Sequence, residues 1–564
     1  DNAAVLQASE KSLSLSVNPS TRQYELNEQQ THIVLKVETH NHPTAIAPFP
    51  GAATGSGGEI RDEAATGRGA KTKAGMCGFS VSQLCLPGMP QPWELDIAQP
   101  SHMASALKIM LEGPVGAASF NNEFGRPNLC GYFRTMLTNQ PQNDGEYVRG
   151  YHKPIMIAGG VGVIKNDLVK KHQLPIGAKL IVLGGPSFAI GLGGGSASSR
   201  ATSQHTEELD FASVQRSNPE MQRRCQEVIN ACVCHGNDNP ILSIHDVGAG
   251  GLSNALPELI ADSDRGAIIE LRTIPCDDAS LSPMEIWCNE SQERYVLGID
   301  SDDIDWFTEI CERERCPFAI VGSVNDSKTL VVNDELTGET VVDLPLDVLF
   351  EKMPRLQCES KRSSNVSPAF TDKDVQLEQA IKRVLQFPCV ASKKFLITIG
   401  DRSVGGLVAR DQMVGRWQVP VADVAVTSAD FSSVHGEAMA IGERAGLALV
   451  DAACSARIAV AESITNIAAA QIASIEHISL SANWMAAPQV GSDGACLYDA
   501  VAAIGMDLCP KLGIAIPVGK DSLSMHCQWQ CEGKGYAVTS PVSLVITASA
   551  PVVDVNKTLT PKLQ

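Results

Sequence analysis

One short stretch near the N-terminus carries the side chains best suited to chemistry. Within KVETHNHP, residues 36–43, Lys36, Glu38 and His40 alternate with smaller neighbours. Because side chains of an extended strand alternate between its two faces, these three leave one face together. The lysine could neutralise phosphate oxygens, the carboxylate could ligate Mg²⁺, and the imidazole could move a proton or orient a polarised oxygen. An ordinary polar strand end is the alternative that these residues alone leave open.

The glycine-rich stretch that follows, residues 51–78, is expected to form loops, and it favours the functional interpretation. Its first glycines allow close backbone approach, and their N–H groups could form an anion-binding nest. Arg61 and Asp62 would add a phosphate donor and a metal-type oxygen. The stretch is neither a P-loop nor a Rossmann fingerprint, since both signatures are absent. The glycines concerned are Gly51, Gly55, Gly57 and Gly58.

A second constellation lies near the C-terminal end. Glu462 and Asn466 are four residues apart in a segment that the sequence predicts to be helical, so they share a face. Asp423 comes from the expected strand 419–427. Three oxygen ligands without sulfur or imidazole suit Mg²⁺ that carries nucleotide phosphates. A solvated glutamate beside a helix-internal asparagine is the alternative.

Three weaker candidates are short polar segments. Asp246 precedes a glycine turn that is expected to open a helix, and NESQER, residues 289–294, is a polar patch among apolar residues. The segment VGKDSLSM, residues 518–525, is expected as a loop after a buried strand. It contains Lys520, Asp521, Ser522 and Ser524. Each of the three segments could bind phosphate or metal, or could be a polar loop.

Composition narrows the class of protein. The 564 residues carry a net charge of −19, which disfavours binding to a nucleic-acid backbone. The 17 cysteines are scattered, which indicates a reducing, cytoplasmic location and no disulfide framework. Cys232, Cys234 and His235 lack the spacing and the second pair of a zinc site. No stretch reaches the roughly 18 apolar residues of a membrane span. The chain begins DNAAV, so we expect a piece of a longer polypeptide.

Hydrophobic patterning predicts three α/β units that could position these side chains. Residues 1–172 form the first unit, 173–356 the second, and 393–564 the third, with a polar linker at 357–392. The first and third units share a layout, which suggests internal duplication. The expected strands are 31–38, 154–164, 179–185, 241–246, 294–300, 319–324, 394–400, 419–427 and 543–552. Helices are expected at 223–233 and about 453–475, and a glycine-rich loop at 191–199.

Several longer motifs together resemble one family, the large single-chain type of formylglycinamide ribonucleotide (FGAR) amidotransferase. They are ETHNHPTAIAPFPGAATGSGGEIRD, FNNEFGRPNLCGYFRT, GYHKPIMIAGG, IHDVGAGGLSNALPELI, WCNESQERYVL, ARDQMVGRWQVPVADVAVT, LSANWMAAP and IPVGKDSLSM. The similarity runs from end to end of the chain. It implies duplicated units like those of aminoimidazole ribonucleotide synthetase, with the first and third units joined through their sheets.

The resemblance implies a ligase of purine biosynthesis. ATP would phosphorylate the amide oxygen of FGAR, and ammonia would displace phosphate from the iminophosphate to give formylglycinamidine ribonucleotide. Ammonia would come from a glutaminase domain, but this chain has no Gly-x-Cys-x-Gly elbow. The family's fourth synthetase unit, a source of one more acidic ligand, is also expected to be missing. No nucleic acid or membrane partner is expected.

The same resemblance assigns residues by motif. His40 looks like the catalytic histidine. Substrate contacts are Thr39, Asn41, His42, Arg61, Gln215, Glu290, Ser291 and Gln292. Nucleotide contacts are Lys36, Gly51, Ala52, Ala53, Thr54, Gly55, Ser56, Gly57, Gly58, Glu59, Ile60, Arg61, Asp62, Gly131, Tyr132, Ala422, Asn483 and Lys520. Metal ligands are Glu38, Asp62, Asp246, Asp423, Glu462, Asn466 and Asp521.

Large members of the family also hold a structural ADP with Mg²⁺ at a pseudosymmetric site. Which of the two sites owns residues 51–62 stays open in the sequence. GDRS, residues 400–403, stands where the first unit has THNHP, and the loss of the histidine agrees with a non-catalytic copy. Three other functions are less favoured: selenophosphate synthesis, a non-catalytic nucleotide scaffold, and a metal module built on His40 and His42.

Overall fold

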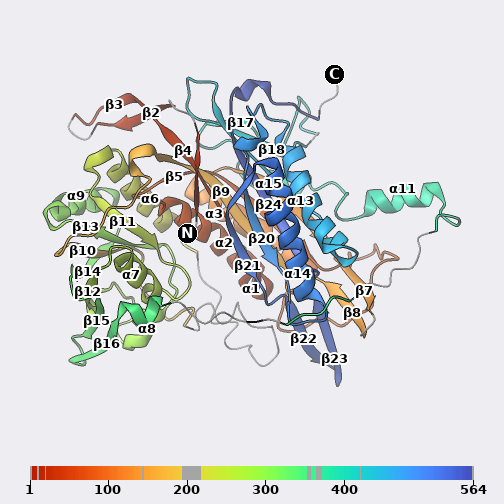
Figure 1. Ribbon diagram of the computed structural model, residues 1–564, viewed down its shortest axis with the longest axis horizontal. Coiled ribbons are helices and arrows are strands. Elements are labelled where there is room, and N and C mark those ends of the chain that lie inside the picture. The colour runs from red at the N-terminus through yellow and green to blue at the C-terminus, as the bar shows by residue number, and fades with distance from the viewer. Residues whose placement is uncertain are drawn as a thin grey trace.

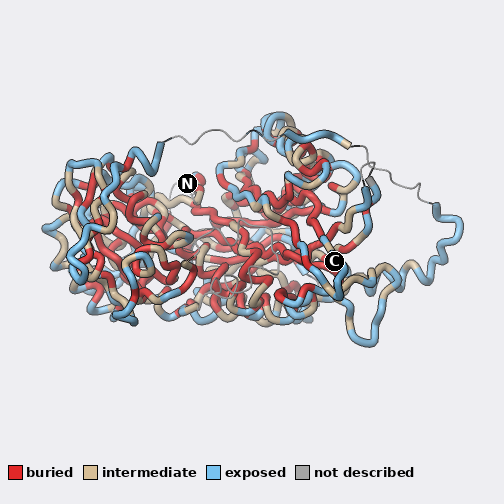
Figure 2. Tube along the Cα trace, turned by 90° about the horizontal axis from the view of Figure 1, so that it is seen from below, coloured by how far each residue is buried: buried red, intermediate tan, exposed pale blue. Residues whose placement is uncertain are grey.

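The computed structural model describes most of the chain from residue 3 to residue 561. The internal segments outside that description are 9–11, 19–20, 143–144, 193–216, 352–356, 358, 364–370 and 420. The described residues form neighbouring α/β units whose strands and inner helix faces are buried (Figure 1, Figure 2). The α/β fold class is as predicted. Among these residues, no helix is long and apolar enough to cross a membrane.

The first sheet has five strands in the order β1-β4-β9-β5-β6, antiparallel except for the pair β5–β6. Its strands are β1 (Ala4–Gln7), β4 (Thr31–Thr39), β5 (Lys71–Val81), β6 (Asn128–Thr135) and β9 (Ile155–Lys165). The helices of this first unit are α1 (Asn41–Ile46), α2 (Pro48–Ala64) and α3 (Ala106–Phe124). Strand β9 is buried along nearly all its length, which explains its unbroken run of small and apolar residues.

The second sheet has seven strands in the order β11-β13-β10-β14-β12-β15-β16. They are β10 (Lys179–Gly184), β11 (Ile241–Asp246), β12 (Gly266–Glu270), β13 (Arg294–Ile299), β14 (Phe318–Asn325), β15 (Thr329–Asp334) and β16 (Glu339–Pro345). The main helices of this second unit are α6 (Pro219–Val233), α7 (Leu252–Ala261) and α9 (Ile304–Glu314). Helix α6 packs against α2 and α3, so the second unit covers the helical side of the first.

The third sheet has six strands in the order β17-β18-β19-β24-β20-β21. They are β17 (Val408–Arg410), β18 (Val424–Ser428), β19 (Gly436–Glu443), β20 (Ser479–Met485), β21 (Ala515–Ser522) and β24 (Ser543–Val552). Its main helices are α13 (Ala452–Ile467) and α14 (Asp493–Ala502). Hairpins from the first and third units join in one more sheet, made of β7 (Leu137–Gln142), β8 (Gly145–Gly150), β22 (His526–Cys531) and β23 (Lys534–Thr539).

The first and third sheets have the same plan. Strands β1-β4-β9-β5-β6 match β18-β19-β24-β20-β21 in order and in direction, with the last pair parallel in each. His40 and Arg444 directly follow the matching strands β4 and β19, and Ala47 and Asp451 directly precede the matching helices α2 and α13. Counterparts in this stretch therefore lie 404 positions apart without a gap. The expected internal duplication is confirmed.

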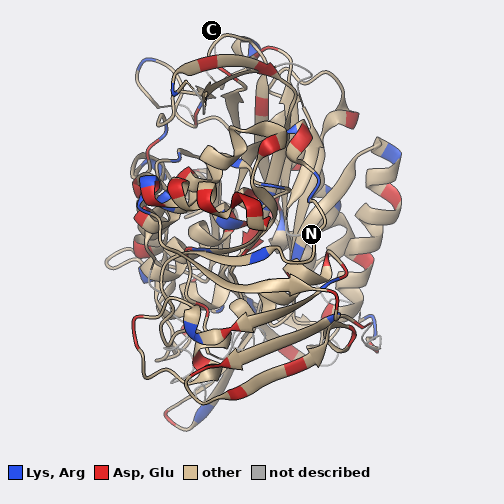
Figure 3. Ribbon diagram, turned by 90° about the vertical axis from the view of Figure 1, so that its left-hand side faces the viewer, with Lys and Arg blue, Asp and Glu red and all other residues tan. Residues whose placement is uncertain are grey.

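The two duplicated units share one hydrophobic core. Ile33 and Leu35 from β4 lie in the same buried cluster as Met439 and Ile441 from β19. Helices α13 and α14 cover the other side of the third sheet, as α2 and α3 cover the first (Figure 1). The prediction that the first and third units join through their sheets is borne out by this shared core. Acidic and basic residues are interspersed over the side of the molecule seen in Figure 3.

Several expected elements differ from the structure. The glycine-rich residues 51–64 form most of helix α2 instead of loops, and residues 394–400 contain the helix α12 (Lys394–Thr398) instead of a strand. Helix α13 ends at Ile467, before the predicted 475. The segment 518–525 is not a loop throughout, because strand β21 continues to Ser522. The linker contains the exposed helix α11 (Leu377–Gln386), which stands away from the body in Figure 1.

Candidate active site

The end of strand β4 gathers the first constellation as predicted. The Lys36 Nζ lies 2.7 Å from Asp62 Oδ2 on helix α2 and 3.5 Å from Glu38 Oε2. His40 follows the strand directly and caps helix α1. The alternation of the strand therefore places a cation, two carboxylates and an imidazole at one edge of the sheet, where α2 crosses it.

The glycines of α2 let this helix approach the strand end closely. A Cβ atom on Gly55 would lie 2.8 Å from His40 Cβ, and one on Gly58 would lie 3.0 Å from Glu38 Oε1. A Cβ on Gly51 would lie 2.5 Å from the backbone of Pro43. Larger residues would separate the helix from the site. The predicted anion nest is wrong, since these amides belong to a regular helix.

The imidazole of His40 is held in one tautomer. Its Nδ1 lies 2.7 Å from the carbonyl oxygen of Gly51. Because a carbonyl oxygen only accepts, Nδ1 carries the proton and Nε2 keeps its lone pair. Loss of hydration in the surrounding protein lowers the pKa of His40 to about 4, although the Glu38 carboxylate opposes the shift. His40 is therefore neutral near pH 7, with Nε2 able to accept a proton.

Carboxyl groups and lysines lie close together in the site and shift one another's pKa. Burial and the carboxylate of Asp246, from the second unit, raise the pKa of Asp62 to about 8. Burial would lower the pKa of Lys36, but the carboxylates of Asp62 and Glu38 outweigh it and raise that pKa. Burial likewise opposes ionisation of Glu38, yet Lys520 and Lys36 lower its pKa. Asp246 thus faces the first unit, as the metal prediction requires.

The donor set suits Mg²⁺. The Oδ1 atom of Asp62 is buried without a hydrogen-bond partner, which is the state of a carboxylate oxygen that a cation would complete. Within the described ranges, no group of three or more His, Cys, Asp or Glu side chains is already arranged around a metal position. Glu38, Asp62 and Asp246 are the residues that would hold the ion. In this structure the ammonium group of Lys36 lies close to Glu38 and Asp62 and offsets their charge.

Lys520 and Ser522 reach the site from strand β21 of the third unit. The Lys520 Nζ lies 3.2 Å from Glu38 Oε2 and 3.2 Å from the carbonyl oxygen of Thr39. The hydroxyl groups of Ser522 and Thr39 are 2.8 Å apart. The sequence assigned Lys520 to the nucleotide, whereas it indicated Ser522 only as part of a segment that could bind phosphate or metal. Asp521 lies between them on an exposed strand, so it points to the opposite face, and the structure does not bring this predicted ligand to Glu38.

Arg61 is buried and joins α2 to the second unit. Its Nη2 donates to Gln292 Oε1, its Nη1 lies 3.5 Å from Gln222 Oε1, and Nη1 is 3.9 Å from Glu293 Oε1. The predicted neighbours Arg61 and Gln292 are therefore together. The sequence did not predict Gln222 or Glu293 as neighbours of Arg61. No local pattern near Arg61 indicates a contact with helix α6, which carries Gln222, or with the residue before β13, which is Glu293.

The remaining predicted substrate residues are held by the protein. Asn41 Oδ1 accepts from the Met156 N–H at 2.9 Å, and His42 is buried in helix α1. Glu290 Oε1 accepts from the Gly250 N–H at 2.9 Å, in the turn after Asp246, and Ser291 Oγ accepts from the Phe188 N–H at 3.0 Å. Asn483 Oδ1 on β20 is buried without a partner. Gln215 and the predicted loop 191–199, beyond its first two residues, lie outside the described residues.

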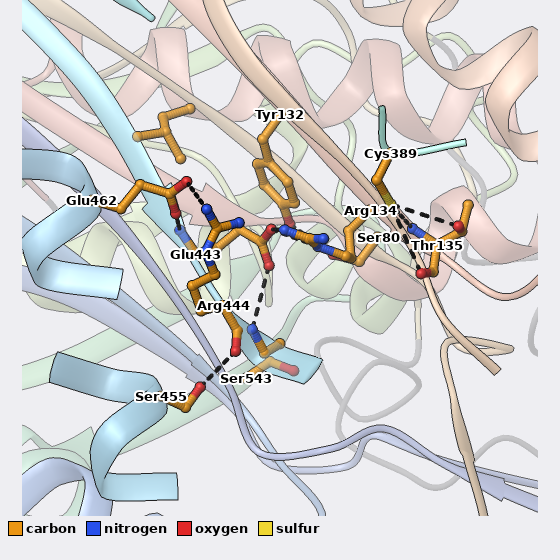
Figure 4. A network of polar contacts seen from close by, with 12 residues as sticks. Ser80, Tyr132, Arg134, Thr135, Cys389, Glu443, Arg444, Ser455, Glu462 and Ser543 are labelled. Atoms are coloured by element: carbon orange, nitrogen blue, oxygen red, sulfur yellow. Dashed lines mark hydrogen bonds and ion pairs between the residues drawn. The ribbon is translucent and has the colours of Figure 1, made fainter. Parts of the chain in front are cut away.

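The second constellation is assembled in part (Figure 4). Glu462 Oε2 accepts from the Glu443 N–H at 2.9 Å, and the Asn466 side-chain amide donates to the Ile441 carbonyl at 2.9 Å. Both side chains therefore share one face of α13, as predicted, and that face meets the end of β19. Asp423 is exposed just before β18, and no contact joins it to Glu462 in the described chain. The predicted three-ligand set is therefore not closed in this structure.

The other residues predicted for the second site lie on neighbouring strands. Tyr132 Oη is 3.0 Å from Ser80 Oγ, and a Cβ on Gly131 would lie 2.1 Å from the Cys77 carbonyl oxygen, so only glycine fits there. Ala422 is buried. Residues 51–62 pack on Glu38 and His40, which assigns them to the first site.

A separate cavity of about 800 Å³ beside the hairpin sheet is lined by Tyr147 and Tyr536 among others. None of the predicted site residues lines it.

The comparison of GDRS with THNHP is wrong. GDRS lies beside the end of α3, where the Asp401 N–H donates to Asn122 Oδ1 at 2.7 Å. The structural counterpart of His40 is Arg444, which follows β19 as His40 follows β4. The conclusion that the histidine is absent from the third unit still holds, but the position and its replacement differ.

Two family models match segments of the chain. The model described as FGAR-AT PurM_N-like domain matches residues 392–551, which contain the third sheet. The model described as AIR synthase related protein, C-terminal domain, matches residues 175–335, most of the second unit. Each match covers less than half of the chain, and each describes a domain of the synthetase type that the sequence resembles. The matches agree with the predicted family, while the ligase activity stays a prediction.

Solved structures of FGAR amidotransferase relatives from Thermotoga maritima show the same fold. PurL complexed with FGAR is similar with a TM-score of 0.68 and 22% identity, over 100% of this chain and 76% of that one. PurL complexed with ADP gives 0.68 and 22%, over 100% and 75%. Phosphoribosylformylglycinamidine synthase II gives 0.66 and 22%, over 100% and 76%. At this identity the similarity establishes the fold, while the roles of individual residues stay predictions.

Proposed function

We propose that this chain converts FGAR, ATP and ammonia to formylglycinamidine ribonucleotide, ADP and phosphate, a step of purine biosynthesis. The observation that carries the proposal is the neutral His40, whose Nε2 is free beside the Mg²⁺-type carboxylates of Glu38 and Asp62. The match of residues 392–551 to the FGAR-AT PurM_N-like domain model and the FGAR and ADP complexes of the similar T. maritima PurL support the choice of substrates.

The reaction needs two displacements. The γ-phosphoryl group of ATP passes to the amide oxygen of FGAR, and the amide nitrogen loses its proton. The product is an iminophosphate, whose oxygen can leave as phosphate. Ammonia then attacks the imino carbon, loses a proton, and phosphate leaves. Glu38, Asp62 and Asp246 would hold Mg²⁺, which would supply positive charge against the charge that develops on the phosphate oxygens.

The residues of the site have distinct roles in this scheme. His40 Nε2 accepts the proton that ammonia loses, since its lone pair is free and Nδ1–H is fixed on Gly51. Lys36 and Lys520 supply positive charge for the transferring phosphoryl group. Asp246, Glu290 and Gln292 come from the second unit, so substrate would bind where the first and second units meet.

We further propose the wider setting that the sequence predicted. The units are residues 1–172, 173–356 and 393–564, joined by the linker 357–392. Ammonia is delivered by a glutaminase partner, and the reaction takes place in the cytoplasm, which agrees with the free thiols of the described cysteines. The third unit holds the structural ADP and Mg²⁺ near Glu462 and Asn466.

The test is phosphate release from Mg-ATP with FGAR and ammonium chloride. His40→Ala is expected to lower kcat by about 10²- to 10⁴-fold while Mg-ATP affinity stays within a factor of about two. His32→Ala is the matched control, because His32 lies on the same strand but bonds to Asn166 at the far end. Release that does not depend on FGAR, or that is equal in the two variants, would contradict the proposal.

A further inference from the structure

The two duplicated units have equivalent strand pairings and equivalent side-chain contacts. Across each sheet, strand pairing links Thr39 to Ile157, Gly78 and Tyr132, and links Glu443 to Val545, Asn483 and Lys520 in the same order. The counterparts of Thr39 and Tyr132 are thus Glu443 and Lys520.

One contact between the units occurs twice. The Thr39 hydroxyl meets Ser522, two residues after Lys520, and the Glu443 carboxylate meets Arg134, two residues after Tyr132. The two site copies can therefore be compared position by position.

The second copy has different chemistry at almost every compared position. Lys36, Glu38 and Lys520 of the first copy correspond to Ala440, Gly442 and Tyr132 of the second. Asp62 corresponds to Asn466, and Gly58 corresponds to Glu462 on helix α13. The first copy thus has its carboxylate on the strand, whereas the second copy has it on the helix. Arg444 occupies the position of His40.

Both oxygens of Glu462 are engaged (Figure 4). Its Oε2 accepts from the Glu443 N–H at 2.9 Å, and its Oε1 lies 3.0 Å from Arg444 Nη2. A divalent cation that uses Glu462 as a ligand therefore needs the oxygen that Arg444 now occupies. The neighbouring ion pair, Arg134 with Glu443, is more enclosed and holds the two units together, so it is not free to exchange.

The Arg444 side chain is able to move. It is 46% exposed, whereas the Glu462 side chain is 26% exposed, and the backbone of Arg444 is anchored separately, since Ser455 Oγ donates to its carbonyl at 2.8 Å. A half-exposed ion pair is weak, because solvent and salt screen it. The guanidinium can therefore leave the carboxylate when a better anionic partner arrives.

We propose that Arg444 is a latch on Glu462 that couples cation binding to phosphate binding in the second copy. A free divalent cation must displace a guanidinium that then has no partner. When a nucleoside di- or triphosphate arrives with the cation, the guanidinium moves to a phosphate oxygen while the cation takes Glu462, and charge stays balanced. The nucleotide as occupant rests on the proposed function; the exchange of partners rests on the contacts of Arg444.

The experiment measures Mn²⁺ affinity by electron paramagnetic resonance in an Asp62→Asn, Asp246→Asn background, which removes two of the first copy's three carboxylate ligands. In this background ADP should tighten Mn²⁺ binding. Arg444→Ala should tighten Mn²⁺ binding without ADP by roughly 2- to 5-fold and should reduce the effect of ADP. Arg444→Lys should restore part of the coupling, because the positive charge remains.

Two controls isolate the latch. Arg457→Ala removes an arginine of similar exposure from α13, the helix that carries Glu462. Arg457 pairs with Asp507, so this change should alter Mn²⁺ affinity neither with ADP nor without it. Glu462→Gln should abolish Mn²⁺ binding at this copy. Thermal unfolding of each variant checks that the fold is intact.

The inference is overturned if Arg444→Ala leaves Mn²⁺ affinity unchanged or weakens it, or if Glu462→Gln binds Mn²⁺ normally. Because these measurements need no turnover, they fail independently of the proposed reaction. A chain without FGAR-dependent phosphate release could still show the coupling, and an active chain could lack it.

Discussion

The carbonyl oxygen of Gly51 determines what His40 can do. By accepting the Nδ1 proton it leaves Nε2 as the basic atom, and desolvation keeps the ring neutral. A general base works only in its unprotonated form. With a pKa of about 4, His40 should not limit the rate on the acid side until pH falls well below 6.

The low pKa of His40 predicts where the acid limb of the pH–rate profile lies. Between pH 6 and 8, kcat/KM should show no titration of His40, and a limb due to His40 should lie near pH 4. Phosphate release measured over that range checks the prediction, with His40→Gln as the reference profile. A limb near the ordinary histidine value of 6.5 that disappears in His40→Gln would show that the imidazole is hydrated and easily charged.

His152 makes a related prediction about stability. Burial lowers the pKa of this histidine to about 4, and its ring stacks on Trp529 at 5.2 Å. The unfolded chain binds the proton first as pH falls, so the stabilisation by neutral His152 is complete above about 6.5 and is lost as pH falls toward 4. His152→Phe keeps a stacked ring but cannot be charged. Its Tm should therefore fall less steeply between pH 7 and 5; equal slopes for the two proteins would contradict this.

Among the elements, helix α2 depends on glycines that would weaken an isolated helix by about 1 kcal/mol each. Gly55→Ala should improve helix propensity, yet its methyl group would lie 2.8 Å from His40 Cβ. We expect a net loss of roughly 1–3 kcal/mol in the free energy of unfolding, together with reduced activity, because overpacking displaces α2 from the strand. Chemical denaturation measures the loss.

Gly505 provides the matched control for that substitution. It lies in a helical segment with no neighbour within 4 Å of a Cβ atom, so Gly505→Ala should be neutral or slightly stabilising. If Gly55→Ala were equally well tolerated, close packing of α2 on β4 would not be the reason for its glycines.

The elements also show what a sequence can and cannot predict. The shared face of Lys36 and Glu38 on β4 followed from alternation alone, and the shared face of Glu462 and Asn466 followed from helical spacing. Helix α2 was mistaken for a loop because glycine content signals flexibility locally, whereas its cause here is tertiary contact with the strand. Residues 394–400 have strand-like composition but gain no strand partner, so they form a short helix.

The contacts of Ser522 with Thr39 and of Gln222 with Arg61 were not predicted, for a different reason. Ser522 meets Thr39 across 483 residues of sequence, and Gln222 meets Arg61 across 161, distances over which no local pattern carries information. The duplication was detected as a shared layout, but its alignment at Arg444 needed strand pairing. Local chemistry was therefore predictable, while the assembly of residues from different units was not.

At the scale of the whole molecule, both site copies lie where the duplicated units meet, so their geometry depends on how these units are held together. Arg149, on β8 of the first unit, binds Asp493 at the start of α14 in the third. The two guanidinium nitrogens Nη1 and Nη2 lie 2.8 Å and 2.9 Å from the two carboxylate oxygens, and the pair is buried. Such a pair fixes orientation, because the planar fork admits one geometry.

Asp493→Ala should therefore destabilise the protein by about 3–5 kcal/mol, since it leaves the buried guanidinium of Arg149 without its anion. Activity in the variant should fall as well, because Lys520 reaches Glu38 only while the units keep their relative position. Denaturant unfolding and phosphate release measure the two effects. The double variant Arg149→Met, Asp493→Leu removes both charges and should recover most of the stability, whereas a double variant as unstable as Asp493→Ala would show that the hydrogen bond of Arg149 to Gln140, and not the ion pair, holds this contact.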